Sequence, residues 1–116
     1  MGVAMEVLFS GVPVREFDIS RDWYGRLFGR PADVVAHDHE VMWRVTDGGW
    51  LYIVKDPDRA GRSLVAISVA DLDAIVADLT HRNLKPGPIE REGDAARKSK
   101  LEDPDGNVVA LIEVVG

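Results

Sequence analysis

The chain has 116 residues, 46% of them hydrophobic and 29% charged, which fits one domain with its own core and is too short for two. It contains no cysteine, which excludes disulfides, thiolate nucleophiles and thiolate metal ligands. A net charge of −6 argues against nucleic acid or an anionic membrane as a partner. With no basic start typical of a secretion signal and no apolar run near the roughly 20 residues of a membrane span, we expect a cytoplasmic protein.

The N-terminal part of the sequence predicts a strand followed by a helix. Residues 7–14, VLFSGVPV, are rich in β-forming side chains and end at a charged turn. Apolar residues then recur at helical spacing from Trp23 to Phe28. Gly29 followed by Pro31 predicts the end of this helix, because glycine accepts the left-handed conformation of a cap and proline cannot continue the helix.

Three short strands are expected next, at 33–36, 40–46 and 50–54. The segment between the last two reads Asp-Gly-Gly, and glycine at such a position favours a tight hairpin turn. The proline of DPDRAGR, which follows, ends the third strand.

The second half of the sequence repeats this order. A strand is expected at 63–69, and an amphipathic helix follows with Asp71 as its N-cap and a stop near Asn83. Strands at 88–92, 97–102 and 108–114 come next, the last two joined by the turn DPDGN. Matching residues of the two halves lie 55 apart (69 − 14 = 55; 86 − 31 = 55).

The sequence therefore predicts one α+β domain made of two tandem βαβββ modules. Module one is expected at about 5–55, a linker at 56–62 and module two at about 63–115.

Three segments carry a resemblance to a known family: VPVREFDISRDWYGRLFGRP, VADLDAIVADL and DPDGNVVALIEV. With these motifs the chain resembles the vicinal oxygen chelate superfamily, which includes glyoxalases, bleomycin-resistance proteins and ring-cleaving dioxygenases. The resemblance implies that the two modules form a curved, mixed-sheet bowl with the helices outside. It also implies a homodimer in which the partner chain often completes the cavity.

In metal-dependent members of that superfamily, four side chains on the cavity floor hold the metal. The resemblance places Phe9, Tyr52, Leu64 and Ala110 at these positions, and none of them is His, Glu, Asp or Gln. Since Mg²⁺, Mn²⁺ and Fe²⁺ prefer oxygen or imidazole ligands, we expect no metal and no cofactor. Glu113, the nearest carboxylate, is expected to point to the opposite face of its strand.

Alternation along the strand puts Trp50 on the same face as Tyr52. A two-residue turn anywhere in Asp-Gly-Gly pairs Trp43 with Tyr52 or with Val54, so Trp43 is predicted to face the cavity too. The remaining large side chains of the hairpin, Met42, Leu51 and Ile53, are then expected to face the helices. The predicted ligand-binding residues are Phe9, Trp43, Trp50, Tyr52, Leu64 and Ala110.

These residues favour a metal-free, dimeric protein that binds an apolar or aromatic small molecule, such as an antibiotic, between its rings. Two alternatives stay open. The rings can instead fill the cavity of a structural or regulatory dimer. The protein can also be a lyase, isomerase or dioxygenase-like enzyme with relocated acid–base or metal chemistry, for which Tyr52 and His39 are the candidate acid–base residues.

Overall fold

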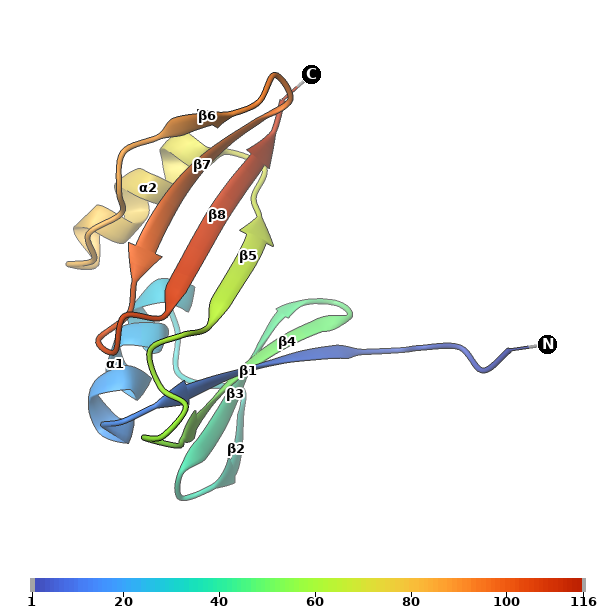
Figure 1. Cartoon of the computed structure of the whole chain (residues 1–116), viewed down its shortest axis with the longest axis vertical. Helices are drawn as coiled ribbons and strands as arrows, with labels where there is room; N and C mark the ends of the chain where they lie inside the picture. Colours follow the sequence, from blue (N-terminus) through green and yellow to red (C-terminus); the bar gives the residue numbers. More distant parts are fainter. Residues whose placement is uncertain (1, 116) are drawn as a thin grey trace.

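The computed structural model describes residues 2–115 and shows the strand–helix–three-strand unit twice (Figure 1). The first copy comprises β1 (Leu8–Val14), α1 (Phe17–Phe28), β2 (Val34–His37), β3 (Glu40–Thr46) and β4 (Gly49–Lys55). The second comprises β5 (Leu64–Ser68), α2 (Leu72–His81), β6 (Glu90–Glu92), β7 (Ala96–Glu102) and β8 (Val108–Val114). The expected α+β fold of two tandem βαβββ modules is confirmed.

Each module contributes one mixed four-stranded sheet. The strand orders are β1-β4-β3-β2 and β5-β8-β7-β6. The opening strand of each module runs parallel to its closing strand, β1 to β4 and β5 to β8, and the other pairs are antiparallel. Consequently β1 and β5 are edge strands, each paired on one side only.

The two modules share a single hydrophobic core. One face of each sheet carries the residues of the core cluster, among them Val12 and Leu51 in the first module and Leu101 and Leu111 in the second. Because side chains alternate along a strand, these residues define a core face, and the residues between them form the opposite face of each sheet. In Figure 1 α2 lies behind its sheet, on this core side.

The turn DPDGN of the second module is anchored to the first module by buried polar contacts. The Tyr24 hydroxyl donates to the Asp103 carboxylate at 2.8 Å, and Asn107 donates to the carbonyl of Pro13 at 3.0 Å. The side-chain oxygen of Asn107 also accepts from the amide of Ser63 at 2.9 Å. Burial raises the pKa of Tyr24, and the adjacent charge of Asp103 raises it further, so this phenol stays a donor.

The helix ends follow the local signals in the sequence. Gly29 caps α1 in the left-handed conformation with φ 72°, and the Asp71 side chain accepts from the Ala74 amide at the start of α2. Asn83, just past the end of α2, has φ 62°. Within residues 2–115, neither helix is long and apolar enough to cross a membrane.

Candidate functional site

On the first module, an aromatic surface covers the sheet face opposite the core. Phe9 of β1 pairs with Trp50 of β4, and the centres of their rings are 6.2 Å apart. Tyr52 pairs with Gly11, and its ring lies so close over this glycine that any added Cβ would collide with it. Glycine at position 11 therefore lets the phenol lie flat on the sheet. Phe9 is 51% exposed, so the surface is open to solvent.

Trp43 does not belong to this surface, and its predicted position facing the cavity is wrong. It is fully buried, with its ring centre 5.6 Å from that of Phe28, and its indole nitrogen donates to the Arg30 carbonyl at 3.0 Å. It pairs with Leu51, a core residue, instead of with Tyr52 or Val54.

A β-bulge explains this difference. The hairpin turn is the Asp47-Gly48 turn, since Thr46 pairs with Gly49, but Arg44 already pairs with Trp50. One extra residue, Val45, is therefore inserted in β3, and it reverses the facing of every residue before it.

Met42 takes the place that sequence reasoning gave to Trp43. It was expected to face the helices, but it pairs with Tyr52 and shares its face of the sheet, opposite the core. Leu51 and Ile53 do face the core as expected. The first-module half of the candidate site thus consists of Phe9, Met42, Trp50 and Tyr52.

The second-module half is aliphatic. Leu64 of β5 is 72% exposed, and the exposed Ala66 two residues further on shares its face. Ala110 of β8 pairs with Ala66 on one side and with Lys100 of β7 on the other. Ala110 itself is buried, at 5% exposure.

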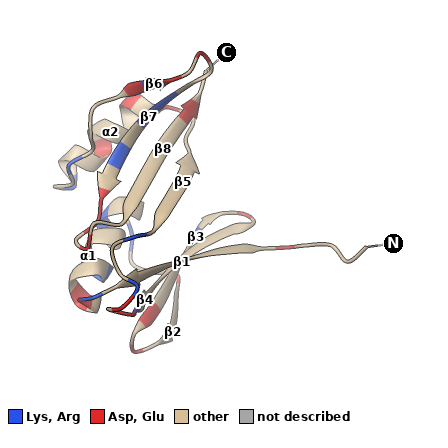
Figure 2. Cartoon of the chain, viewed as in Figure 1, with Lys and Arg blue, Asp and Glu red and all other residues tan. Residues whose placement is uncertain are grey.

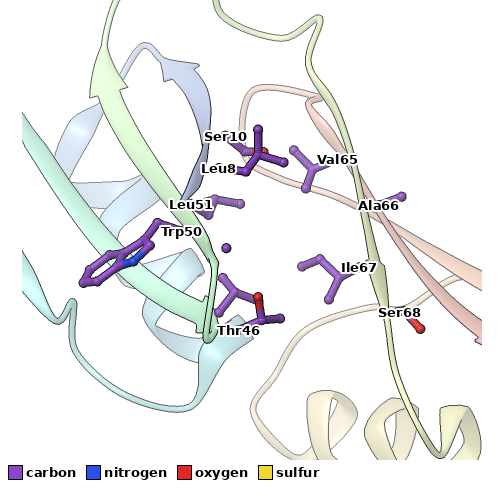
Figure 3. Close-up of a pocket in the computed structure, with 11 residues that line it drawn as sticks. Leu8, Ser10, Thr46, Trp50, Leu51, Val65, Ala66, Ile67 and Ser68 are labelled. Atoms are coloured by element: carbon purple, nitrogen blue, oxygen red, sulfur yellow. The ribbon is translucent and has the colours of Figure 1, made fainter. Parts of the chain in front are cut away.

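The four floor positions do not converge within one chain. In Figure 3 Leu51 of the first sheet and Ile67 of the second point toward one another, into the gap between the modules. Trp50 points out of this gap on one side, and Ala66 points out of it on the other. The aromatic half-site and the aliphatic half-site therefore face away from each other, on opposite sides of the shared core.

The gap itself is an apolar hollow of about 200 Å³. Its lining comes from the core-facing side chains at the ends of both sheets, including Leu8, Val45, Leu51, Val65 and Ile67. Trp50 and Ala66 also belong to this lining, but their side chains point away from the hollow (Figure 3).

The residues at the floor positions do not fit a metal. The side chains of Phe9, Leu64 and Ala110 offer no ligand atom, so Tyr52 alone contributes an oxygen.

An acidic cluster of Asp71, Asp73 and Glu113 lies on the core side of the second sheet instead. Glu113 points away from the Ala110 face, as predicted, and accepts from the Leu72 amide at 2.8 Å. Arg97 donates to both Asp73 and Glu113 at 2.9 Å. These bonds hold the pKa of Glu113 below its ordinary value, the Leu72 amide contributing most. These three carboxylates lie at the N-terminus of α2, and each already accepts a hydrogen bond from a protein donor.

The two candidate acid–base residues lie apart. The His39 ring packs edge-on against Phe17 of α1, with ring centres 6.1 Å apart, which places it on the helix side of the first sheet. Tyr52 lies on the other side, over Gly11. Neighbouring His37 is exposed and lies 3.8 Å from the Glu40 carboxylate, in keeping with a solvated turn.

Charge is distributed unevenly over the strands (Figure 2). The strands β6 and β7 are strongly charged, whereas β1 and β5, the two edge strands that open the modules, carry no charged residue. Basic and acidic side chains otherwise gather in the turns and on the helices.

Comparison with known proteins places this architecture in a family. The family model described as "Glyoxalase/Bleomycin resistance protein/Dioxygenase superfamily" matches residues 7–111, so the chain belongs to this superfamily. A glyoxalase/bleomycin resistance protein from Catenulispora acidiphila DSM 44928 is 34% identical, with a TM-score of 0.89, over 95% of this chain and 99% of that one.

Two more distant structures share the fold. TnmS3, an antibiotic binding protein from Streptomyces sp. CB03234, is 23% identical with a TM-score of 0.76, over 98% of both chains. The oxidase ChaP-H1 is 21% identical with a TM-score of 0.73, over 95% of this chain and 96% of that one. No curated protein sequence matches the chain.

Proposed function

We propose that this protein is a metal-free binding protein for a planar, apolar or aromatic small molecule, such as an antibiotic. The observation that carries the proposal is the surface of Phe9, Trp50 and Tyr52, which is solvent-accessible, lies along two parallel strands and is not used by the shared core. Flat aromatic rings at the wall of a cleft bind flat ligands by stacking. The likeness to an antibiotic binding protein, TnmS3, supports this class of ligand.

The proposal includes a homodimer, because each chain carries two half-sites that face away from each other. A two-fold axis brings the aromatic half-site of one copy opposite the aliphatic half-site of the other, and does so twice. Each resulting bowl would hold Phe9 and Tyr52 from one chain and Leu64 and Ala110 from the second. Exposed Leu64 and Phe9 would then be covered by the dimer and its ligand.

The absence of metal in the proposal rests on the chemistry of the floor residues, since only Tyr52 offers an oxygen. An enzyme with a relocated acid–base pair has less support, because Tyr52 and His39 lie on opposite faces of the first sheet. If the protein were instead a dimer with a filled cavity, an added aromatic probe would leave the fluorescence of Trp50 unchanged. The experiment below distinguishes such a dimer from a binding protein.

The test uses the three tryptophans, Trp23, Trp43 and Trp50. In the double variant Trp23→Phe/Trp43→Phe the emission reports on Trp50 alone, and we expect quenching by 8-anilinonaphthalene-1-sulfonate, a planar aromatic probe. The matched variant Trp50→Phe keeps Trp23 and Trp43, which are nearly or fully buried, and should not respond. Equal responses of the two variants would contradict an aromatic site at Trp50.

Native mass spectrometry with and without Mn²⁺, Ni²⁺ and Zn²⁺ tests the rest of the proposal. We expect a dimer whose mass does not change when these ions are added. A tightly bound ion in a one-to-one ratio with the chain would contradict the metal-free site.

A further inference from the structure

A lysine lies beside the alanines of the aliphatic half-site. Lys100 of β7 pairs with Ala110, and Ala110 pairs with Ala66, so the three residues form one row across the second sheet. Directly paired residues share a face of the sheet, which puts Lys100 on the face opposite the core. The next residue along the strand, Leu101, belongs to the core instead. The Lys100 side chain therefore leaves the sheet next to the floor position of Ala110.

Neither the fold nor edge protection accounts for a charge at this position. Tyr52 and Ala110 are the corresponding floor positions of the two modules, and the residue that pairs with Tyr52 on β3 is Met42. The first module thus carries a methionine where the second carries Lys100. Charged residues also protect the edges of sheets, but β7 lies between β8 and β6 and is not an edge strand.

The charge of Lys100 is not neutralised by a direct contact. Within residues 2–115, Lys100 forms no salt bridge, whereas Lys98 on the same face forms one with Glu92. Lys98 also pairs across the strands with Glu90. The other carboxylate on this face of β7 is that of Glu102, two residues along the strand, which at the usual rise is about 7 Å between Cα atoms. Lys100 is therefore the lysine of this face that is available to a ligand.

A polar hollow of about 220 Å³ lies next to Lys100. Both lysines line it, together with Glu90, Gly87 and Pro88. The segment before β6 is held against β7 at this point, since the Gly87 amide donates to the Lys100 carbonyl at 2.8 Å and the Ser99 hydroxyl donates to the Gly87 carbonyl at 2.7 Å. A water molecule takes about 30 Å³ of liquid, so the hollow has room for a small charged group with its hydration water.

We propose that the ligand of this site is an aromatic anion, and that Lys100 binds its negatively charged group. The planar ring system of the ligand would lie against Trp50 and Tyr52. Its carboxylate, sulfonate or phenolate group would reach Lys100 across Ala66 and Ala110, whose small side chains leave space over the sheet. This inference rests on the proposed function and narrows it to aromatic molecules that carry a negative charge.

The acidic net charge of the chain does not prevent the binding of an anion at this point. The net charge is −6, but exposed charges are screened beyond about 10 Å at 0.1 M salt. The nearest unpaired cation then decides the local interaction. A hydrogen bond from an ammonium group to an ionised acceptor is also roughly twice as strong as one between neutral groups.

Two probes with the same ring system test the proposal. 8-Anilinonaphthalene-1-sulfonate carries a negative charge, and N-phenyl-1-naphthylamine lacks the sulfonate. Each is titrated, by its own fluorescence, against the native protein and against Lys100→Gln. Because the lost contact is a charge-assisted one at a partly exposed site, we expect Lys100→Gln to weaken binding of the sulfonate roughly fivefold to tenfold. Binding of the uncharged probe should stay unchanged.

Two further variants separate a local contact from a general effect of charge. Lys85→Gln removes the same charge from an exposed loop position after α2 and should leave binding of both probes unchanged. Lys100→Arg keeps the charge and should restore binding of the sulfonate. Added salt should weaken binding of the sulfonate to the native protein and have a smaller effect on Lys100→Gln.

The outcomes distinguish this inference from the proposed function. If the native protein binds both probes and Lys100→Gln changes neither affinity, or weakens both equally, the role of Lys100 is overturned and the aromatic site remains. An equal loss of sulfonate binding in Lys85→Gln would also overturn it, because long-range charge would then explain the effect. If the native protein binds neither probe, the proposed function fails, and this inference fails with it.

Discussion

At the scale of single residues, two tryptophans of one hairpin have different roles. Trp43 is fully buried against Phe28, whereas Trp50 lies on the open face beside Phe9. We expect Trp43→Ala to reduce the free energy of unfolding by about 3–5 kcal/mol, the usual cost of removing a buried aromatic side chain. Trp50→Ala should cost far less and should abolish binding of the aromatic probe. Urea unfolding and probe titration of both variants measure this; a larger stability loss in Trp50→Ala would contradict the assignment.

The ionisation of Glu113 makes the free energy of unfolding depend on pH. Its folded pKa lies below the ordinary value near 4.5, because the Leu72 amide and Arg97 stabilise the carboxylate. A lowered folded pKa means that this stabilisation is complete above the unfolded pKa and is lost as the pH falls through the folded pKa.

Glu113→Gln should therefore be less stable than the native protein at neutral pH, and the difference should shrink as the solution is acidified. Urea unfolding of both proteins at neutral pH and at about pH 3 checks the sign. A difference that stays constant over this range would show that Glu113 does not act through its charge.

At the scale of elements, local signals predicted the helices and their ends. Asp71 supplies the predicted N-cap of α2. Gly29 ends α1 in the left-handed conformation, which glycine adopts readily. The insertion of Val45 in β3 could not be foreseen, because the two possible turns of Asp-Gly-Gly both assume a regular ladder. One extra residue was enough to exchange the faces of Met42 and Trp43.

The cap of α2 gives a test at this scale. Asp71→Ala removes the side chain that accepts from the Ala74 amide at 3.1 Å, and should cost about 0.5–2 kcal/mol of unfolding free energy. Asp78→Ala, in the last turns of the same helix, is the matched control. A negative charge near a helix C-terminus is unfavourable, so this control should be neutral or slightly stabilising. Equal losses in both variants would contradict capping by Asp71.

At the scale of the whole molecule, the sequence predicts which residues occupy the floor positions but not how the two modules arrange them. Alternation and the repeat can place Phe9 and Leu64 on corresponding strands, yet they do not determine how two modules pack. That packing depends on contacts between distant segments, such as the bond from Tyr24 to Asp103 and that from Asn107 to Pro13. In the folded chain these contacts direct the two half-sites away from each other.

If a complete site combines the two modules of different copies, two defective variants should restore each other. Trp50→Ala damages the aromatic half-site, and Leu64→Glu puts a charge on the aliphatic one at an exposed position. Each variant alone should bind no probe. Random mixing makes roughly half of the dimers mixed, and each mixed dimer has one intact site, so about a quarter of the full binding capacity should return.

Equilibrium dialysis with 8-anilinonaphthalene-1-sulfonate, on samples refolded together, counts the restored sites, and sedimentation shows that both variants still dimerise. A site contained within one chain predicts no recovery at any mixing ratio, since every chain then keeps its own defect. Recovery near a quarter would instead require that Trp50 of one chain and Leu64 of another surround the same ligand. The size of the recovery thus measures how the family fold is divided between two copies of this chain.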